Sequence, residues 1–101
     1  MAMADDLDEA FFSRADEHIR LSNRHLKEIA KGRVSASMMY ATARFNAWIS
    51  ASGFTNAEKM QEARNETVEY FVTQYKKMLE DNLDDYISKF ESYMRPRSSA
   101  E

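Results

Sequence analysis

The chain has 101 residues, with 14 lysines and arginines against 17 aspartates and glutamates, and it has no cysteine. This length predicts one domain, here residues 1–101, and the lack of cysteine excludes disulfides, thiolate zinc sites and cysteine nucleophiles. The net charge of −3 does not indicate nucleic-acid binding, and no apolar run is long enough to cross a membrane. The first twelve residues, MAMADDLDEAFF, are acidic where a secretory signal is basic, so this stretch is not expected to be such a signal. The absence of cysteine is in keeping with a cytoplasmic protein.

The first predicted helix runs from about Leu7 to Lys31. Only two glycines and one proline occur in the chain, and this scarcity of breakers favours long helices. Asp5 or Asp6 would cap the first turn, and Gly32 stands where a left-handed C-cap belongs. Apolar and small residues recur at steps of three and four and form one stripe: Leu7, Phe11, Ala15, Ile19, Ser22, Leu26 and Ile29.

The second predicted helix begins at Ser35, as its N-cap, and ends before Gly53, with Phe54 folding back on Ile49. Within it, Arg44 is the one charged residue, in a chain that is 31% charged. One face has mostly large side chains: Val34, Met38, Ala41, Phe45, Trp48, Ile49 and Ser52. The opposite face has mostly smaller ones: Ala36, Met39, Tyr40, Ala43, Ala47 and Ser50.

Both faces of this helix are therefore expected to be buried. We expect the large face to meet the first and third helices. The small face would meet either a fourth helix or another subunit, because small residues allow close approach of helix axes. Arg44 falls on the border between the two faces, where its stem can cover apolar surface while its head reaches a carboxylate.

The third predicted helix opens at Thr55 and Glu58, which have the spacing of a capping box. Two apolar stripes follow, and a break is predicted near Asn82, with Asp84 opening a fourth helix. One uninterrupted helix to Met94 is the alternative, because the second stripe shows no change of phase. The predicted fold is all-α, a small helical bundle of three long helices plus a shorter C-terminal helix, with frayed ends at about 1–5 and 95–101.

Two segments of the chain resemble a family of short bacterial proteins known as domain of unknown function 3144. They are FFSRADEHIRLSNRHLKEIAKGRVSASMMYATARFNAW and VEYFVTQYKKMLEDNLDDYISKF. The resemblance runs from about Phe11 to Phe90, and its most specific blocks are GRVSASMMYATARFNAW and YKKMLEDNLDDYI. It implies a bacterial, cytoplasmic protein and brings no activity, substrate or catalytic residue with it.

The two histidines are the first candidates for chemistry. His18 and His25 lie seven residues apart, on one side of the first predicted helix. Two turns of helix separate them by about 10 Å, so they cannot share one metal ion unaided. We therefore interpret them as residues at the edge of the core. A carboxylate from a later helix would be needed to complete a metal site.

A basic stripe on the first helix is the second candidate. Its cations follow at steps of three and four and are joined by two arginines further on: Arg20, Arg24, Lys27, Lys31, Arg33 and Arg44. Such a surface can track phosphates, but it also complements a helix dipole. No aromatic residues alternate with these cations, so a base-stacking surface is not indicated.

An acidic cluster is the third candidate: Glu80, Asp81, Asp84 and Asp85. It lacks the glycine turn and the alternating ligands of a calcium loop. We interpret it mainly as helix caps, or as a surface that pairs with the basic stripe of a neighbouring molecule.

Three functions remain open at this point. The favoured one is a non-enzymatic, cofactor-free helical protein that binds another protein or itself. Nucleic-acid or phosphate-ligand binding through the basic stripe is less favoured. An enzyme or metal protein around His18 and His25 is the third.

Overall fold

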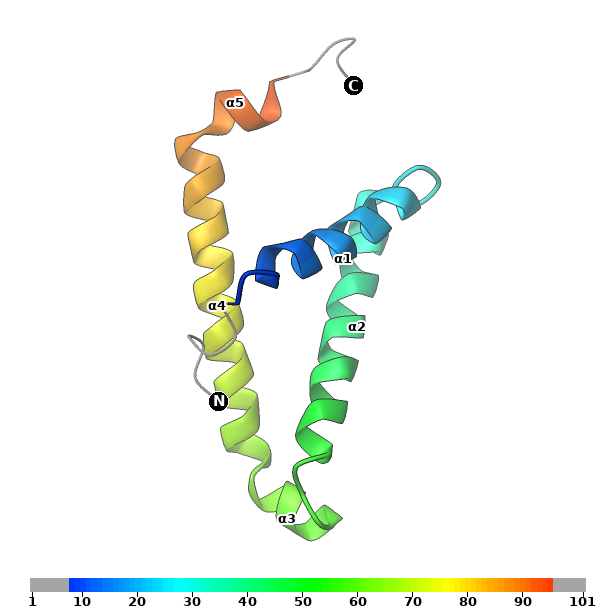
Figure 1. Ribbon diagram of the computed structural model, residues 1–101, viewed down its shortest axis with the longest axis vertical. Coiled ribbons are helices and arrows are strands. Elements are labelled where there is room, and N and C mark those ends of the chain that lie inside the picture. Colours follow the sequence, from blue (N-terminus) through cyan, green and yellow to red (C-terminus); the bar gives the residue numbers. More distant parts are fainter. Residues whose placement is uncertain (1–7, 96–101) are drawn as a thin grey trace. The chain divides into compact units, whose positions relative to one another are not determined.

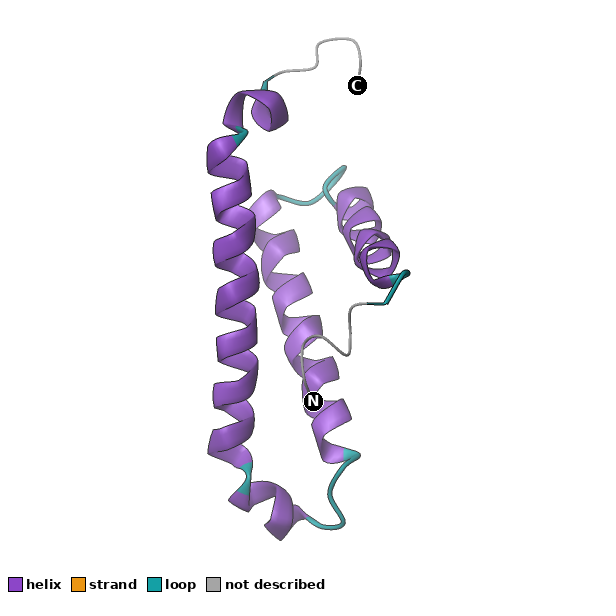
Figure 2. Cartoon of the chain, turned by 60° about the vertical axis from the view of Figure 1, so that its left-hand side comes forward, coloured by secondary structure: helices purple, strands orange, loops and turns teal. Residues whose placement is uncertain are grey.

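The computed structural model describes residues 8–95, which form five helices (Figures 1 and 2). They are α1 (Phe11–His25), α2 (Lys31–Ala51), α3 (Ala57–Glu62), α4 (Arg64–Ser88) and α5 (Phe90–Met94). Helices account for 82% of these residues, which include no strand, so the predicted all-α class is confirmed. The predicted caps Asp5 and Asp6 lie outside the described residues, as do the predicted frayed ends apart from Arg95.

The chain divides into two compact units, Met1–Gln61 and Glu62–Glu101. In the first unit, Asp8 prepares the start of α1. Its carboxylate accepts a hydrogen bond from the Ala10 N–H at 2.9 Å and pairs with Arg14 at 3.0 Å. These contacts, the one with Arg14 first, lower the pKa of Asp8 below its ordinary value. Asp8 thus orders the residues just before α1, although no side chain caps the helix itself at Ala10.

The turn between α1 and α2 corrects two predicted boundaries. Helix α1 ends at His25, and the N–H groups of Glu28 and Ile29 both bond to the His25 carbonyl, at 3.1 and 2.9 Å. Ala30 is then extended, with ψ at 146°, and α2 begins at Lys31. The predicted helix to Lys31 is therefore too long, because the turn uses ordinary backbone conformations that need no glycine.

Gly32 and Ser35 consequently lie inside α2 rather than at helix ends. Neither glycine of the chain has a left-handed φ, so the predicted cap at Gly32 is wrong. Ser35 is not an N-cap, because the helix starts four residues earlier, after Ala30, and no side chain caps it. At the other end, the Phe54 N–H bonds to the Ala51 carbonyl at 3.1 Å and not to that of Ile49, so the predicted fold-back is not formed.

The contact between α1 and α2 provides the one buried residue of the described chain, Val34, which is 6% exposed. One turn further along α2, Met38 meets α1 directly, since the Ser22 hydroxyl donates to its sulfur at 3.5 Å. The start of the predicted large face thus packs as expected. Phe45 and Trp48, on the same face, are exposed, so the prediction that this face is buried along its whole length is not met.

Helix α3 begins at the predicted place, but a different residue caps it. The Asn56 side-chain oxygen accepts from the Lys59 N–H at 2.8 Å, so Asn56 caps the helix and Thr55 does not. Asparagine is as good a cap as any residue. Ala63 separates α3 from α4.

In the second unit, the predicted break near Asn82 is wrong, because the helix continues through that residue to Ser88. The alternative of one uninterrupted helix from the opening near Thr55 to Met94 is also wrong, because the chain breaks at Ala63 and at Lys89. Helix α4 has 25 residues, and the Asn82 side chain donates to the Met78 carbonyl at 2.7 Å without ending the helix. The break comes at Lys89, with φ at −120° and ψ at 30°. Figure 1 shows α5 turned away from the axis of α4.

Candidate interaction surface

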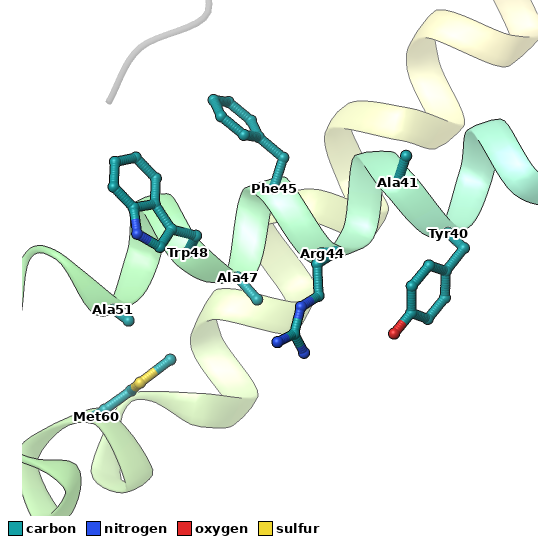
Figure 3. A pocket seen from close by; sticks show the side chains of 8 residues that line it. All are labelled: Tyr40, Ala41, Arg44, Phe45, Ala47, Trp48, Ala51 and Met60. Atoms are coloured by element: carbon teal, nitrogen blue, oxygen red, sulfur yellow. The ribbon is translucent and has the colours of Figure 1, made fainter.

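An apolar hollow lies on α2 and α3 (Figure 3). It is lined by aromatic and small residues, one methionine and one arginine: Tyr40, Ala41, Arg44, Phe45, Ala47, Trp48, Ala51 and Met60. All but Met60 come from α2. The lining combines large apolar side chains with alanines, at which another chain can approach the helix closely.

Three exposed aromatic side chains line the hollow, with Phe45 and Trp48 on one side of α2 and Tyr40 on the other (Figure 3). Tyr40, Phe45 and Trp48 are 68%, 61% and 64% exposed. The rings of Phe45 and Trp48 are stacked, with centroids 6.0 Å apart and planes inclined by 30°. This mutual contact fixes the two rings together and leaves their outer surfaces open to solvent.

Arg44 gives the hollow its charge. Its side chain extends from the same side of α2 as those of Tyr40 and Ala47 (Figure 3). It is exposed and forms no ion pair with any residue between 8 and 95. The expectation that its head reaches a carboxylate is therefore unfulfilled within this part of the chain. The hollow suits an apolar ligand that carries a negative group.

The small face of α2 is also open. Ser50 is half-buried, and the other five residues predicted on this face are exposed: Ala36, Met39, Tyr40, Ala43 and Ala47. Tyr40 and Ala47 line the hollow, so the hollow takes in part of both predicted faces. Met60 was not connected with the second helix on sequence grounds, so its part in completing this surface was missed. The short loop after α2 was the available signal, since it brings the start of α3 back towards the end of α2.

The basic stripe is divided by the turn after His25. Arg20 and Arg24 lie on α1, Lys27 lies in the turn, and Lys31 and Arg33 lie in the first turn of α2. All five are exposed, and none of them pairs with an acid in the described part of the chain. The cations were predicted to lie along one face of a single helix. Instead, they lie on both sides of the turn between α1 and α2 and within it.

The remaining candidates are not assembled into a site. His18 and His25 are exposed on α1, and no cluster of three or more histidine and acidic side chains suited to a metal ion occurs within residues 8–95. The acidic cluster lies within α4, where Asp81 pairs with Lys77 at 3.0 Å. Glu80 and Asp84 are exposed on the same helix.

Asp85, the last of the acidic cluster, belongs to a contact that we call the C-terminal clasp, made by Asp85, Lys89 and Tyr93. The Tyr93 hydroxyl donates to the Asp85 carboxylate at 2.9 Å, and the Lys89 ammonium lies 3.2 Å from it. These two contacts lower the pKa of Asp85 and raise the pKa values of Lys89 and Tyr93. The rings of Tyr86 and Tyr93 also meet, with centroids 4.6 Å apart.

The comparisons with known proteins agree with the residues that carry the resemblance. The model of the family described as "Protein of unknown function (DUF3144)" matches residues 11–87, and the chain belongs to this family. A comparison with curated proteins gives no match. The matched residues include α1 to α3 and all of α4 except Ser88, and they end before α5.

One solved structure is similar to this chain over most of the length of both. The NMR structure of the protein NB7890A from Shewanella sp. is 42% identical in sequence, with a TM-score of 0.73. The match covers 87% of this chain and 94% of that one. No helix of the described residues has both the length and the apolar character needed to span a membrane.

Proposed function

We propose that this protein acts without catalysis, by self-association through the apolar faces of its helices. The observation that carries the proposal is the hollow on α2, where Tyr40, Phe45 and Trp48 are each more than 60% exposed. Contiguous apolar patches of this kind mark interaction sites on soluble proteins. Aromatic side chains of this kind also dominate binding energies at protein interfaces.

The exposed aromatic side chains of α2 would gain free energy from being buried against another molecule. Burying an exposed large apolar side chain contributes about 1.5–3 kcal/mol, so the paired rings of Phe45 and Trp48 supply a larger driving force than a single side chain would. Only Val34 is buried in the described chain. Association would therefore supply apolar contacts that these helices lack. Helices from two or more copies would then together form the predicted helical bundle.

Light scattering and sedimentation over a concentration series test this proposal. We expect a monomer that gives way to a dimer or higher oligomer as the concentration rises. Trp48→Ala should shift that equilibrium towards the monomer. The matched control is Phe12→Ala on α1, because Phe12 is 71% exposed and lies outside the hollow. A protein that stays monomeric up to millimolar concentration would contradict self-association.

Nucleic-acid or phosphate binding is the second candidate. It is supported by the cations around the α1–α2 turn, which have no acidic partner in the described chain. We favour it less, because no aromatic residue lies among these cations to stack on bases. Anisotropy titrations with single- and double-stranded DNA and RNA at low salt decide it, since real binding would weaken steeply as salt is added.

A further inference from the structure

Helices α2 and α4 carry opposite charges. Helix α2 has three cationic residues and no acidic one. Helix α4 also has three cationic residues, but it has six acidic ones: Glu66, Glu69, Glu80, Asp81, Asp84 and Asp85. The two longest helices of the chain are therefore electrostatically complementary, by about three charges each.

Two of the cations of α2 lie on one line along the helix. Arg33 and Arg44 are eleven residues apart, which is close to three full turns and about 16 Å of helix rise. Both are exposed and neither pairs with an acid between residues 8 and 95. Arg44 is also the charged residue of the hollow, so this line of charge runs into the exposed apolar patch.

Helix α4 presents a matching pattern in negative charge. Its exposed apolar residues recur at steps of three and four along one stripe: Val68, Val72, Tyr75, Leu79, Leu83 and Tyr86. At 100° per residue, Glu69 and Glu80 border this stripe on the same side. They too are eleven residues apart, and both are exposed without an ion pair in the described chain.

From this correspondence we infer that α4 of a second copy covers the hollow on α2, with Glu69 and Glu80 facing Arg33 and Arg44. The inference rests on the self-association proposed above and names its surfaces. The apolar stripe of α4 would lie against Phe45 and Trp48. The alanines of the hollow would allow the two helix axes to come close. A two-fold dimer makes this contact twice, because each copy offers one α2 and one α4.

The charges favour α4 of the second copy over α2 of the second copy as the helix that covers the hollow. Packing two α2 helices face to face would place cations against cations, because α2 has no acidic residue to offset them. Like charges opposed across an interface repel each other and disfavour that pairing. Helix α4 combines an exposed apolar stripe with bordering carboxylates at the spacing that Arg33 and Arg44 require.

Charge reversal tests the inference. In Arg44→Glu, the dimer dissociation constant from sedimentation should rise by at least about tenfold, since an attraction becomes a repulsion. Combining it with Glu69→Arg or with Glu80→Arg should bring the constant back to within about threefold of the parent in one of the two double variants. Which one recovers reports whether the helices run parallel or antiparallel. Arg20→Glu on α1 makes the same change in net charge and should leave the constant unchanged.

The outcomes separate this inference from the proposed function. Self-association that is equally strong in Arg44→Glu and in the parent would overturn the pairing of α2 with α4 and leave self-association standing. Weakening by Arg44→Glu without recovery in either double variant also overturns the pairing. A protein that is monomeric at all concentrations overturns both. Circular dichroism on each variant confirms that its helices are intact.

Discussion

Among the interruptions between the described helices, the break between α1 and α2 and the break between α4 and α5 are held in different ways. In the first, backbone groups make the hydrogen bonds of the turn, and no side chain caps the start of α2 at Ala30. In the second, the side chains of Asp85, Lys89 and Tyr93 hold the break at Lys89. A break that is held by backbone hydrogen bonds requires no particular residue types, so it is hard to recognise in a sequence. A break of the second kind depends on a few identifiable side chains.

The largest effect is expected at Val34, which is buried where α1 meets α2. Val34→Ala removes two buried carbons and leaves a gap, which should cost about 1–3 kcal/mol of unfolding free energy. In a domain of this size that lowers the melting temperature by several degrees. Thermal unfolding followed by circular dichroism measures it.

Ser35→Ala is the matched control for Val34, because Ser35 is exposed on the neighbouring position of α2. Within a helix, this change should be neutral or slightly stabilising. A loss of about 1 kcal/mol would instead mean that Ser35 caps the helix. That result would contradict a start of α2 at Lys31.

Gly32→Ala tests whether the first break needs a glycine. Gly32 lies in the first turn of α2, has no left-handed φ, and has nothing within 4 Å of an added Cβ. Alanine should therefore stabilise the protein, by up to about 0.5–1 kcal/mol, because it restricts the unfolded chain and favours the helix. At a left-handed cap the same change would destabilise, so the sign of the shift in melting temperature decides the point.

The two breaks also explain how far the sequence could predict the fold. Helical periodicity and the scarcity of glycine and proline were enough for the all-α class and for the approximate places of the long helices. The end of α1 at His25 could not be predicted, because the turn from Leu26 to Ala30 contains no glycine or proline. The glycine just beyond that turn, Gly32, suggested a later boundary. At the C-terminal end, Asn82 suggested a break, but its side chain bonds to the carbonyl four residues back and the helix continues.

The candidate site was predicted only in part, for a related reason. The scarcity of charge in α2 led to the prediction that both of its faces are covered, but Phe45, Trp48 and most of the small face are exposed. A single sequence does not indicate whether the cover comes from the same chain or from another one. Phe45 and Trp48 have the residue types of a core, and only the structure shows that they are exposed.

The smallest effect is expected at the C-terminal clasp, where all three side chains remain in contact with water. Tyr93→Phe removes the hydrogen bond that does most to lower the pKa of Asp85, so this pKa should rise towards its ordinary value while Lys89 still holds it somewhat below. Because the pKa of Asp85 is lowered in the folded chain, its contribution is present above the pKa of the unfolded chain. That contribution is lost as the pH falls through the lowered value.

The clasp is therefore expected to open on acidification, and Tyr93→Phe should move that opening to higher pH. It should also open in strong base, as the pH rises through the raised pKa values of Tyr93 and Lys89. An NMR titration of the side-chain carboxyl carbons measures Asp85 directly. Asp81 is the internal control, because its partner is Lys77 and the variant leaves that pair intact. If Asp85 titrates identically in the parent and in Tyr93→Phe, the clasp does not hold the second break, and both breaks would then depend on the backbone alone.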